Sequence, residues 1–479
     1  MPENTGRSAD ATGRLLWAPV AWLDGRWRDA VLLKVDRAGR WAEITPAVAA
    51  PPADAVRLAG PLLPGLVDAH SHAFQRAFAG LAERRAAGPD GAADDFWSWR
   101  DRMYRVALRI TPQQLRAVAA QLYVELLRGG YTQVCEFHYL QHAEDGGRYA
   151  DPATLAWALA DAAQEAGIGL TVLPVLYERA GFGEPQLRGD QRRFESNAES
   201  VDTLQRAVRA ARRPLLGAGV AIHSLRAAPA ASIAALMHRI GDDAMPVHIH
   251  VAEQTREVDD CVAATGARPI EWLCREFALD RRWQLVHATH ATPAEIDAVA
   301  ASGAGIVLCP STEANLGDGL ADLPRWLGAG VPLALGSDSQ VSRSWAAELR
   351  WLEYGQRLVR RERNVAAAAQ QGESATAARL FERMLAGSAP AAGLDRHGLV
   401  VGARADALVL DMQAPGLVGV PNSHALDGLV FATDAPAFRA VYVAGRRVIE
   451  NGRHIDEAAI AQRFSAAMAA LWSESAATA

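Results

Sequence analysis

The sequence contains almost no lysine. Lys34 is the only one, so 48 of the 49 lysine and arginine residues are arginine. No Schiff-base lysine, phosphate-loop lysine or carbamylated bridging lysine can therefore lie between residues 35 and 479. Chemistry that depends on a lysine side chain is excluded for most of the chain.

Cysteines and long apolar runs are also scarce. The four cysteines form no C-x-x-C pair, and we expect them to be buried free thiols in a reducing compartment: Cys135, Cys261, Cys274 and Cys309. Residues 1–14 lack the apolar core of a signal peptide, and the apolar segment 15–23 is too short to span a membrane. These features predict a cytoplasmic protein with no membrane partner.

Positive charge is not in excess. The chain has 55 acidic residues against 49 lysine and arginine residues, a formal net charge of -6. General attraction to nucleic acid is therefore not expected. An anionic small-molecule substrate would need a local cluster of arginine.

Eight short apolar segments alternate with helical sequence rich in Ala, Leu, Arg and Glu. They cover residues 67–72, 132–139, 170–177, 220–224, 247–253, 284–290, 305–310 and 332–338. This alternation predicts an α/β fold with a (β/α)8 TIM-like barrel. A doubly wound open sheet is the alternative, but no G-x-G-x-x-G follows the first strand. Helix starts are predicted at Thr111 and Thr292, each followed by Pro and, three residues on, by Gln or Glu.

Short strands are also predicted at both ends of the chain. Residues 15–23, 30–35 and 41–44 have the same pattern as 398–411 and 440–452, the last forming a hairpin around Ala444-Gly445. We therefore expect the two termini to build one small β-domain. The predicted division is residues 1–62 and 397–455 for that domain, 63–396 for the barrel, and 456–479 for a C-terminal helix.

The first barrel strand ends in His70 and His72, within Leu63-Pro-Gly-Leu-Val-Asp-Ala-His-Ser-His72. Residues two apart in a strand point to the same side, so both imidazoles can reach one metal ion. His250 and Asp338 close the fifth and eighth strands and complete a shell of three His and one Asp. The alternatives are a polar pair closing a strand, His248 in place of His250, and a helix cap for Asp338.

Two further residues near these ligands are candidates for acid/base chemistry. Glu253 can carry a proton from water to a leaving nitrogen, and His287 can hydrogen-bond the attacking oxygen. Glu253 is an odd number of residues from His250, so a regular strand would point it the other way. A bend at the strand end is required to bring it into the site. His290 is assigned a structural role.

Further polar residues fall near the predicted strand ends: Gln75, Arg100, Tyr139, His223 and Arg226. Two arginines at separate strand ends can grip a dicarboxylate. With 48 arginines in the chain, coincidence is the alternative explanation for both.

The motif around His70, the later H-x-A-E and S-D, and the stretch Gly402-Ala-Arg-Ala-Asp-Ala-Leu-Val-Leu-Asp411 resemble the amidohydrolase superfamily. More narrowly, the chain resembles the formimidoylglutamate deiminases. That resemblance is carried by His70-Ser-His-Ala-Phe-Gln-Arg-Ala77, Phe96-Trp-Ser-Trp-Arg100, Glu136-Phe-His-Tyr139, His223-Ser-Leu-Arg226, Pro246-Val-His-Ile-His250, Ser311-Thr-Glu-Ala-Asn-Leu-Gly-Asp-Gly319 and Trp351-Leu-Glu-Tyr-Gly-Gln-Arg357.

The resemblance implies a β-sandwich from both termini, a homodimer, and one Zn2+ (or another divalent metal) on His70, His72, His250 and Asp338. It assigns Glu253, His287 and Asp338 to catalysis and the five polar residues above to substrate binding. The implied reaction is hydrolysis of N-formimino-L-glutamate to N-formyl-L-glutamate and ammonia in histidine degradation. The alternatives are a deaminase of another substrate, such as an aromatic base, and a barrel that binds a metal or ligand without catalysis.

Overall fold

A computed structural model describes residues 13–85 and 94–473. Its centre is a closed barrel of eight parallel strands in which neighbours in space follow the chain order, with the last strand paired to the first. The strands are β6 (Leu66–Ser71), β7 (Tyr131–His138), β8 (Gly169–Leu176), β10 (Val220–Ile222), β11 (Val247–Val251), β12 (Trp283–His287), β13 (Gly305–Leu308) and β14 (Leu333–Leu335). The predicted barrel is confirmed.

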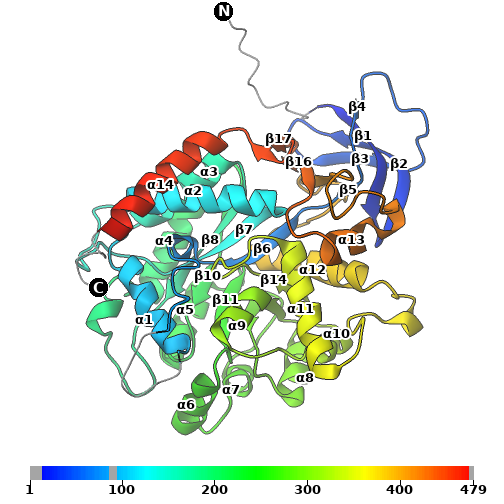
Figure 1. Ribbon diagram of the computed structural model, residues 1–479. Helices are drawn as coiled ribbons and strands as arrows, with labels where there is room; N and C mark the ends of the chain where they lie inside the picture. Colours follow the sequence, from blue (N-terminus) through cyan, green and yellow to red (C-terminus); the bar gives the residue numbers. More distant parts are fainter. Residues whose placement is uncertain (1–12, 86–93, 474–479) are drawn as a thin grey trace, which may run out of the picture.

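Helices surround the barrel and cover its outer face (Figure 1). They are α2 (Pro112–Arg128), α3 (Thr154–Ala166), α4 (Ala198–Ala210), α5 (Ala230–Ile240), α6 (Thr255–Thr265), α7 (Pro269–Glu276), α8 (Pro293–Ser302), α10 (Leu323–Ala329), α11 (Trp345–Arg360) and α12 (Thr376–Ala392). The short helix α9 (Pro310–Leu316) follows β13 directly and lies at the carboxyl end of that strand. Capping boxes on Thr111 and Thr292 begin α2 and α8, as predicted. The long first connection holds a short 3-10 helix, η1 (Ala73–Ala77), and α1 (Phe96–Ala107).

The strands of the two termini form one nine-stranded sheet beside the barrel (Figure 1). The N-terminal part supplies β1 (Leu15–Leu23), β2 (Arg26–Val35), β3 (Trp41–Thr45), β4 (Val56–Arg57) and β5 (Leu62–Leu63). The C-terminal part supplies β15 (Ala407–Leu410), β16 (Phe438–Val443), β17 (Arg446–Glu450) and β18 (Arg453–His454). The two parts join where β5 pairs antiparallel with β15.

This terminal sheet encloses a small core of its own. Leu33 of β2, Trp41 of β3 and Val409 of β15 belong to one buried cluster, although β3 and β15 lie far apart in the strand order. The amide of Trp41 also donates to the carbonyl of Ala403, just before β15. The sheet therefore folds over onto itself, which buries apolar side chains that a flat sheet would leave in water.

The last helices complete the structure. Helix α13 (Ala425–Phe431) contacts α11 and α12, and α14 (Glu457–Trp472) packs along α2. The indole of Trp472 donates to the carbonyl of Ala77, which fixes the end of α14 close to η1. Across the described ranges, no helix combines the length and the apolar character that a membrane crossing requires.

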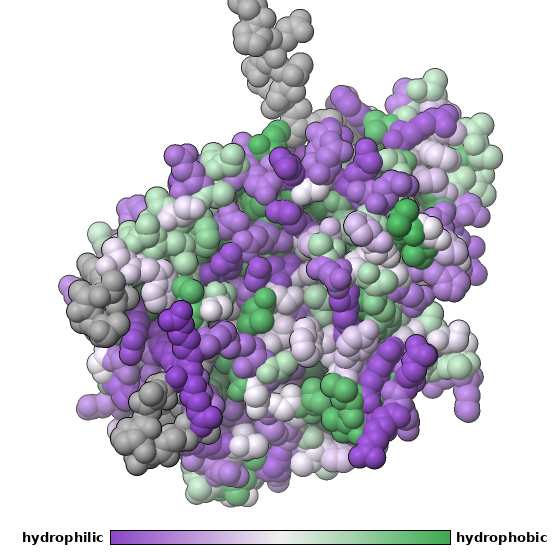
Figure 2. All heavy atoms as spheres, in the orientation of Figure 1, coloured by the Kyte–Doolittle hydropathy of each residue, from purple (hydrophilic) through white to green (hydrophobic). Residues whose placement is uncertain are grey.

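The surface in Figure 2 is mostly hydrophilic, and its apolar patches are small and separate.

All four cysteines are free thiols; Cys274 is half-buried and the others are buried. The predicted burial therefore holds for three of the thiols, whereas Cys274, on α7, is partly exposed.

Candidate active site

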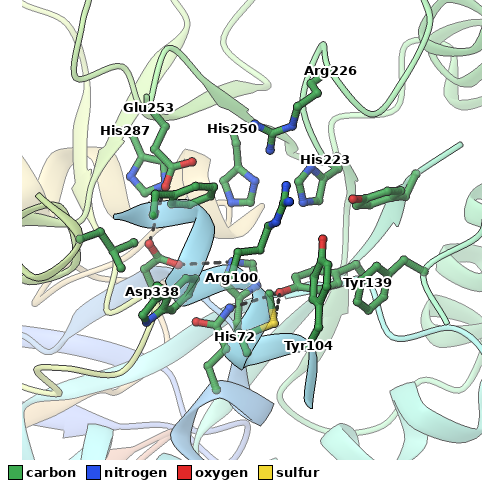
Figure 3. A pocket seen from close by; sticks show the side chains of 17 residues that line it. His72, Arg100, Tyr104, Tyr139, His223, Arg226, His250, Glu253, His287 and Asp338 are labelled. Carbon is green, nitrogen blue, oxygen red and sulfur yellow. Dashed lines mark hydrogen bonds and ion pairs between the residues drawn. The ribbon is translucent and has the colours of Figure 1, made fainter. Parts of the chain in front are cut away.

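The polar residues predicted to form a site converge at the carboxyl ends of the barrel strands. Ten of the eleven line one pocket: His72, Gln75, Arg100, Tyr139, His223, Arg226, His250, Glu253, His287 and Asp338. The eleventh, His70, lies fully buried beneath it. Figure 3 shows Arg100 and Arg226 on one side of this pocket, with Glu253, His287 and Asp338 on the other.

The first and last barrel strands bring His70, His72 and Asp338 together through their backbones. The amide of Asp338 donates to the carbonyl of His70 (2.9 Å), and the amide of His72 donates to the carbonyl of Asp338 (3.3 Å). Oδ1 of Asp338 then lies 3.4 Å from Nε2 of His70 and 3.3 Å from Nε2 of His72. Both imidazoles do point to one side, as the two-residue spacing predicts.

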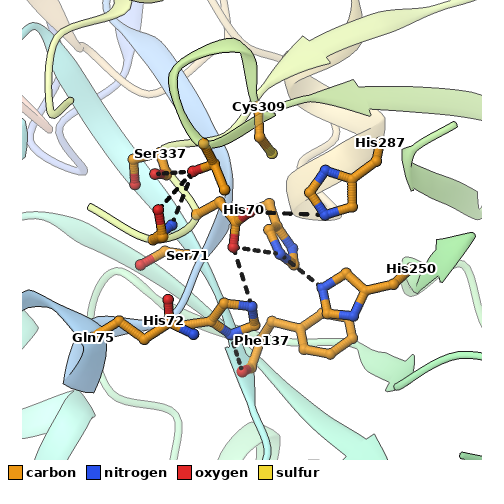
Figure 4. Close-up of polar contacts among 12 residues, drawn as sticks. His70, Ser71, His72, Gln75, Phe137, His250, His287, Cys309 and Ser337 are labelled. Atoms are coloured by element: carbon orange, nitrogen blue, oxygen red, sulfur yellow. Dashed lines mark hydrogen bonds and ion pairs between the residues drawn. The ribbon is translucent and has the colours of Figure 1, made fainter. Parts of the chain in front are cut away.

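His250 completes this group from the end of β11. Its Nε2 lies 3.0 Å from Nε2 of His70, and its ring stacks on Phe137 (Figure 4). The Nδ1–H of His72 faces the carbonyl of Phe137 at 3.2 Å, which leaves the lone pair of Nε2 directed at the centre of the group. His248 points elsewhere, because its Nε2 lies 2.8 Å from the carbonyl of Ala391.

The protonation of these four side chains suits a divalent cation. Burial lowers the pKa of His70, His72 and His250, that of His72 to about 3, so their ring nitrogens are neutral. Burial alone would raise the pKa of Asp338, but its contacts with the surrounding histidines hold that pKa below its usual range. Their ligand atoms fall into two groups that share His70, one with His72 and His250 and one with His287 and Asp338, and the atoms of each group lie within 4.8 Å of one another. Imidazole nitrogens and carboxylate oxygens are donors that zinc takes. The residues therefore fit a divalent metal ion.

Glu253 enters the pocket because the chain bends directly before it. Ala252 has φ +52°, a left-handed conformation that ends the alternation of β11. The amides of Ala252 and Glu253 both donate to the carboxylate of Glu257, at 3.2 and 3.1 Å. The bend required by the sequence pattern is therefore present, and Glu257 holds it.

His287, the last residue of β12, lies between three carboxylates. Its Nε2 is 3.7 Å from both Oε1 of Glu253 and Oδ2 of Asp338, and its Nδ1 is 3.4 Å from Oε1 of Glu313. Burial lowers the pKa of His287, but Glu253, Glu313 and Asp338 outweigh this effect and raise the pKa to about 10. The imidazole is therefore held as a cation.

The pKa of Glu253 is raised to about 7, chiefly by burial, with the charge of His287 opposing the rise. A carboxyl with a pKa near neutrality can both accept and donate a proton at physiological pH. Glu313 lies on the far side of His287 and accepts the backbone N–H of Cys309 at 3.0 Å. Glu313 supports the ring of His287. Cys309, Glu313 and His287 are also close enough to one another to form a metal-binding group.

The opposite side of the pocket carries hydrogen-bond donors and aromatic rings. The amide nitrogen of Gln75 donates to the hydroxyl of Tyr139 at 3.2 Å. His223 directly follows β10, and burial lowers its pKa well below the usual value. The side chain of Arg179 donates hydrogen bonds to the backbone carbonyls of Leu225 and Arg226. These bonds fix the loop that carries Arg226.

Several lining residues were not singled out from the sequence: Met103, Tyr104, Tyr177, Phe194 and Leu316. A signal existed for two of them. Tyr104 lies four residues after Arg100 and so on the same face of α1. Tyr177 directly follows β8, in the position that Tyr139 takes after β7.

Comparisons with known proteins define the family. The model of the amidohydrolase family matches residues 62–448. This chain belongs to that family.

Individual relatives agree with this assignment. The chain is 47% identical over 454 residues to a formimidoylglutamate deiminase from Pseudomonas aeruginosa, covering 94% of this chain and 97% of that protein. A crystal structure of an amidohydrolase from Brucella melitensis matches with a TM-score of 0.89 and 40% identity, covering 96% of this chain and 99% of that one. A zinc-bound adenosine deaminase from Xanthomonas campestris, at 23% identity and a TM-score of 0.78, covers the same shares and shares the fold.

Proposed function

We propose that this protein hydrolyses N-formimino-L-glutamate to N-formyl-L-glutamate and ammonia. The observation that carries the proposal is the division of the pocket into two charged sides. The carboxyl groups of Glu253 and Asp338 lie against the three histidines, and Arg100 and Arg226 face them. The substrate has the complementary pattern, with a cationic amidine at one end and two carboxylates at the other. The 47% identity to a formimidoylglutamate deiminase supports the same substrate.

His70, His72, His250 and Asp338 would hold one divalent cation, and we propose Zn2+. Such an ion supplies Lewis-acid polarisation and lowers the pKa of a water molecule bound to it. The protein's own contribution is to keep these imidazoles neutral through burial and to fix the ring of His72 through the carbonyl of Phe137.

Glu253 is proposed to move the proton. Its carboxylate accepts one proton from the water as the oxygen bonds to the formimino carbon, and then donates that proton to the terminal amidine nitrogen. The bond between the carbon and this nitrogen breaks, ammonia leaves, and the remaining hydroxyl becomes the formyl carbonyl as Asp338 accepts its proton. The cationic His287, beside Glu253, stabilises negative charge that develops on the attacking oxygen. Glu313 holds the imidazole in that orientation from behind.

Arg100 and Arg226 are proposed to bind the carboxylates by charge-assisted hydrogen bonds. Gln75, Tyr139 and His223 would orient the rest of the substrate. The aromatic rings of Tyr104 and Tyr177 narrow the pocket and exclude water, which strengthens each charge interaction inside it.

The wider assignments are proposals of the same kind. Histidine degradation follows from the substrate, and a cytoplasmic location from the four free thiols. A homodimer is suggested only by the sequence resemblance. No nucleic-acid partner is proposed, because the net charge is negative.

The test is ammonia release from N-formimino-L-glutamate by purified, zinc-loaded protein, with N-formimino-L-aspartate and guanine as comparators. We expect fast release that is selective for the glutamate compound. Release from guanine alone would favour a deaminase of aromatic bases. Bound zinc with no release from any of the three would contradict the proposed reaction.

A further inference from the structure

A second hollow opens outward from the pocket, and the proposed reaction does not account for it. Arg100 and Arg226 line both spaces, whereas Trp97, Arg188 and Arg256 line only the outer one. Trp97 belongs to α1, and Arg256 lies in the first turn of α6, three residues after Glu253. The outer hollow therefore adjoins the pocket, and the two spaces meet at two shared arginines.

Three guanidinium groups gather around the single indole of Trp97. Their central carbons lie 4.6 Å (Arg100), 5.3 Å (Arg226) and 4.9 Å (Arg256) from the ring centre. A guanidinium that contacts an aromatic ring through its flat face keeps its N–H groups available at its edge. Trp97 thus brings three cations close together, and within residues 13–85 and 94–473 their side chains donate no hydrogen bond.

Few direct hydrogen bonds or ion pairs in the described part of the chain satisfy these three guanidinium groups. Glu257 and Glu253 lie near enough to Arg226 for its charge to oppose the rise in their pKa, and Glu184 and Asp260 also line the outer hollow. Arg100 and Arg256 each have one acidic partner beyond hydrogen-bond distance, Asp101 at 3.8 Å and Asp260 at 3.7 Å. Arg226 is only 8% exposed, and its Nη1 is buried without a hydrogen-bond partner in the described part of the chain. Buried donors of this kind are normally satisfied, so their arrangement indicates an anionic ligand.

We propose that Arg256 and Arg226, held on Trp97, form an outer carboxylate subsite. It would bind the substrate carboxylate farther from the amidine carbon, which makes Arg256 a specificity-determining residue for a five-carbon dicarboxylate. This inference rests on the proposed function for the identity of the substrate. The nearer carboxylate is carried by the carbon that is bonded to the internal amidine nitrogen. It stays in the inner pocket with Arg100.

The competing explanation is an ordinary surface ion pair. The side chain of Arg256 is 67% exposed, and Asp260 lies four residues further along α6. The two explanations predict opposite effects for Asp260→Asn. If Arg256 serves a ligand, loss of Asp260 frees it and binding is unchanged or tighter. If the ion pair only stabilises α6, Asp260→Asn should weaken ligand binding in the same way as Arg256→Gln.

The first measurement is calorimetric binding of glutarate, with butyrate as a probe that has the inner carboxylate only. For Arg256→Gln we expect roughly tenfold weaker binding of glutarate, the loss of one charge-assisted hydrogen bond, and little change for butyrate. Arg206→Gln is the matched control, because Arg206 is 65% exposed and also pairs with an aspartate four residues away, on α4. Equal glutarate binding by wild type and Arg256→Gln would overturn the subsite, as would weaker binding by Asp260→Asn.

Kinetics then separate the subsite from the proposed function. Arg256→Gln should lower kcat/KM for N-formimino-L-glutamate roughly tenfold, mostly through KM, and should change N-formimino-L-aspartate less. Equal losses for both substrates would contradict a role in reading chain length. If wild-type protein releases no ammonia, the proposed function fails, but the glutarate measurement still decides whether the subsite exists.

Discussion

Nε2 of His287 lies 3.7 Å from Oε1 of Glu253, although the two residues belong to the carboxyl ends of different barrel strands. Each changes the other's protonation, because the carboxylate raises the pKa of the imidazole and the imidazole opposes the rise in the pKa of Glu253. The result is a fixed cation beside a carboxyl whose pKa is close to neutrality. This pair is the part of the pocket that is suited to proton transfer.

The first prediction concerns Glu253→Gln. The amide keeps the size of the side chain but cannot carry a proton, so ammonia release from N-formimino-L-glutamate should fall by about 100-fold or more. Metal content, measured by elemental analysis, should stay the same, because Glu253 is not among the four proposed ligands. Glu348→Gln is a matched control, since Glu348 is also a fully buried carboxyl but does not line the pocket. Full activity of Glu253→Gln would refute the proton-transfer role.

The second prediction concerns the two arginines that line the inner pocket. Arg100→Met and Arg226→Met should each raise KM for N-formimino-L-glutamate by about tenfold or more, because each removes a charge-assisted contact with a carboxylate. Steady-state kinetics with Arg206→Met as the control would measure this. An enzyme for an uncharged aromatic base would not need these two arginines. An unchanged KM in both variants would therefore contradict the dicarboxylate substrate.

The third prediction concerns the backbone that places Glu253. Ala252 is left-handed, a conformation that costs a residue with a Cβ about 1 kcal/mol and costs glycine little. Ala252→Gly should leave the midpoint of thermal unfolding unchanged or raise it slightly. Ala252→Val should lower both the midpoint and kcat, because a β-branched residue resists this conformation and displaces Glu253. Equal behaviour of the two variants would show that the bend does not constrain the site.

The fourth prediction concerns the pH dependence of stability. Glu348 accepts the N–H and Oγ–H of Ser311, and burial raises its pKa to about 8 from a usual value of 4.5. Between these two pH values the folded protein keeps a proton that the unfolded chain has lost, so stability falls as the pH rises through about 8.

Glu348→Gln removes this titration while keeping an acceptor for Ser311. The unfolding midpoint of the wild type should therefore drop further between pH 5 and pH 9 than that of the variant, as followed by calorimetry. A parallel decline in both proteins would contradict the raised pKa of Glu348.

Much of the site could be predicted because the barrel constrains it. Parallel strands that close into a barrel place the residues at the carboxyl end of each strand around one axis, which brings His70, His250 and Asp338 toward one another. The eight strands and the polar residues near their ends are visible in the sequence pattern. The hairpin around Ala444-Gly445 follows from local turn preferences and is present between β16 and β17.

The remaining features of the site depend on backbone conformations and tertiary contacts that the periodicity of the sequence does not predict. Left-handed backbone at Ala252, His287 and Asp338 redirects side chains at the strand ends, and none of these residues is a glycine. The three guanidinium groups on Trp97 come from α1, α6 and the loop after β10, which are distant in sequence. Their assembly depends on tertiary packing rather than on local sequence.

The pairing of β5 with β15 also has a consequence for how the chain is made. During synthesis the ribosome releases the N-terminal strands long before their partners around residue 408 exist. Until then, β5 presents an unpaired edge, which is a site for association with other nascent chains. The barrel between them can meanwhile form its own core, so the terminal sheet is expected to be the last part of the molecule to close.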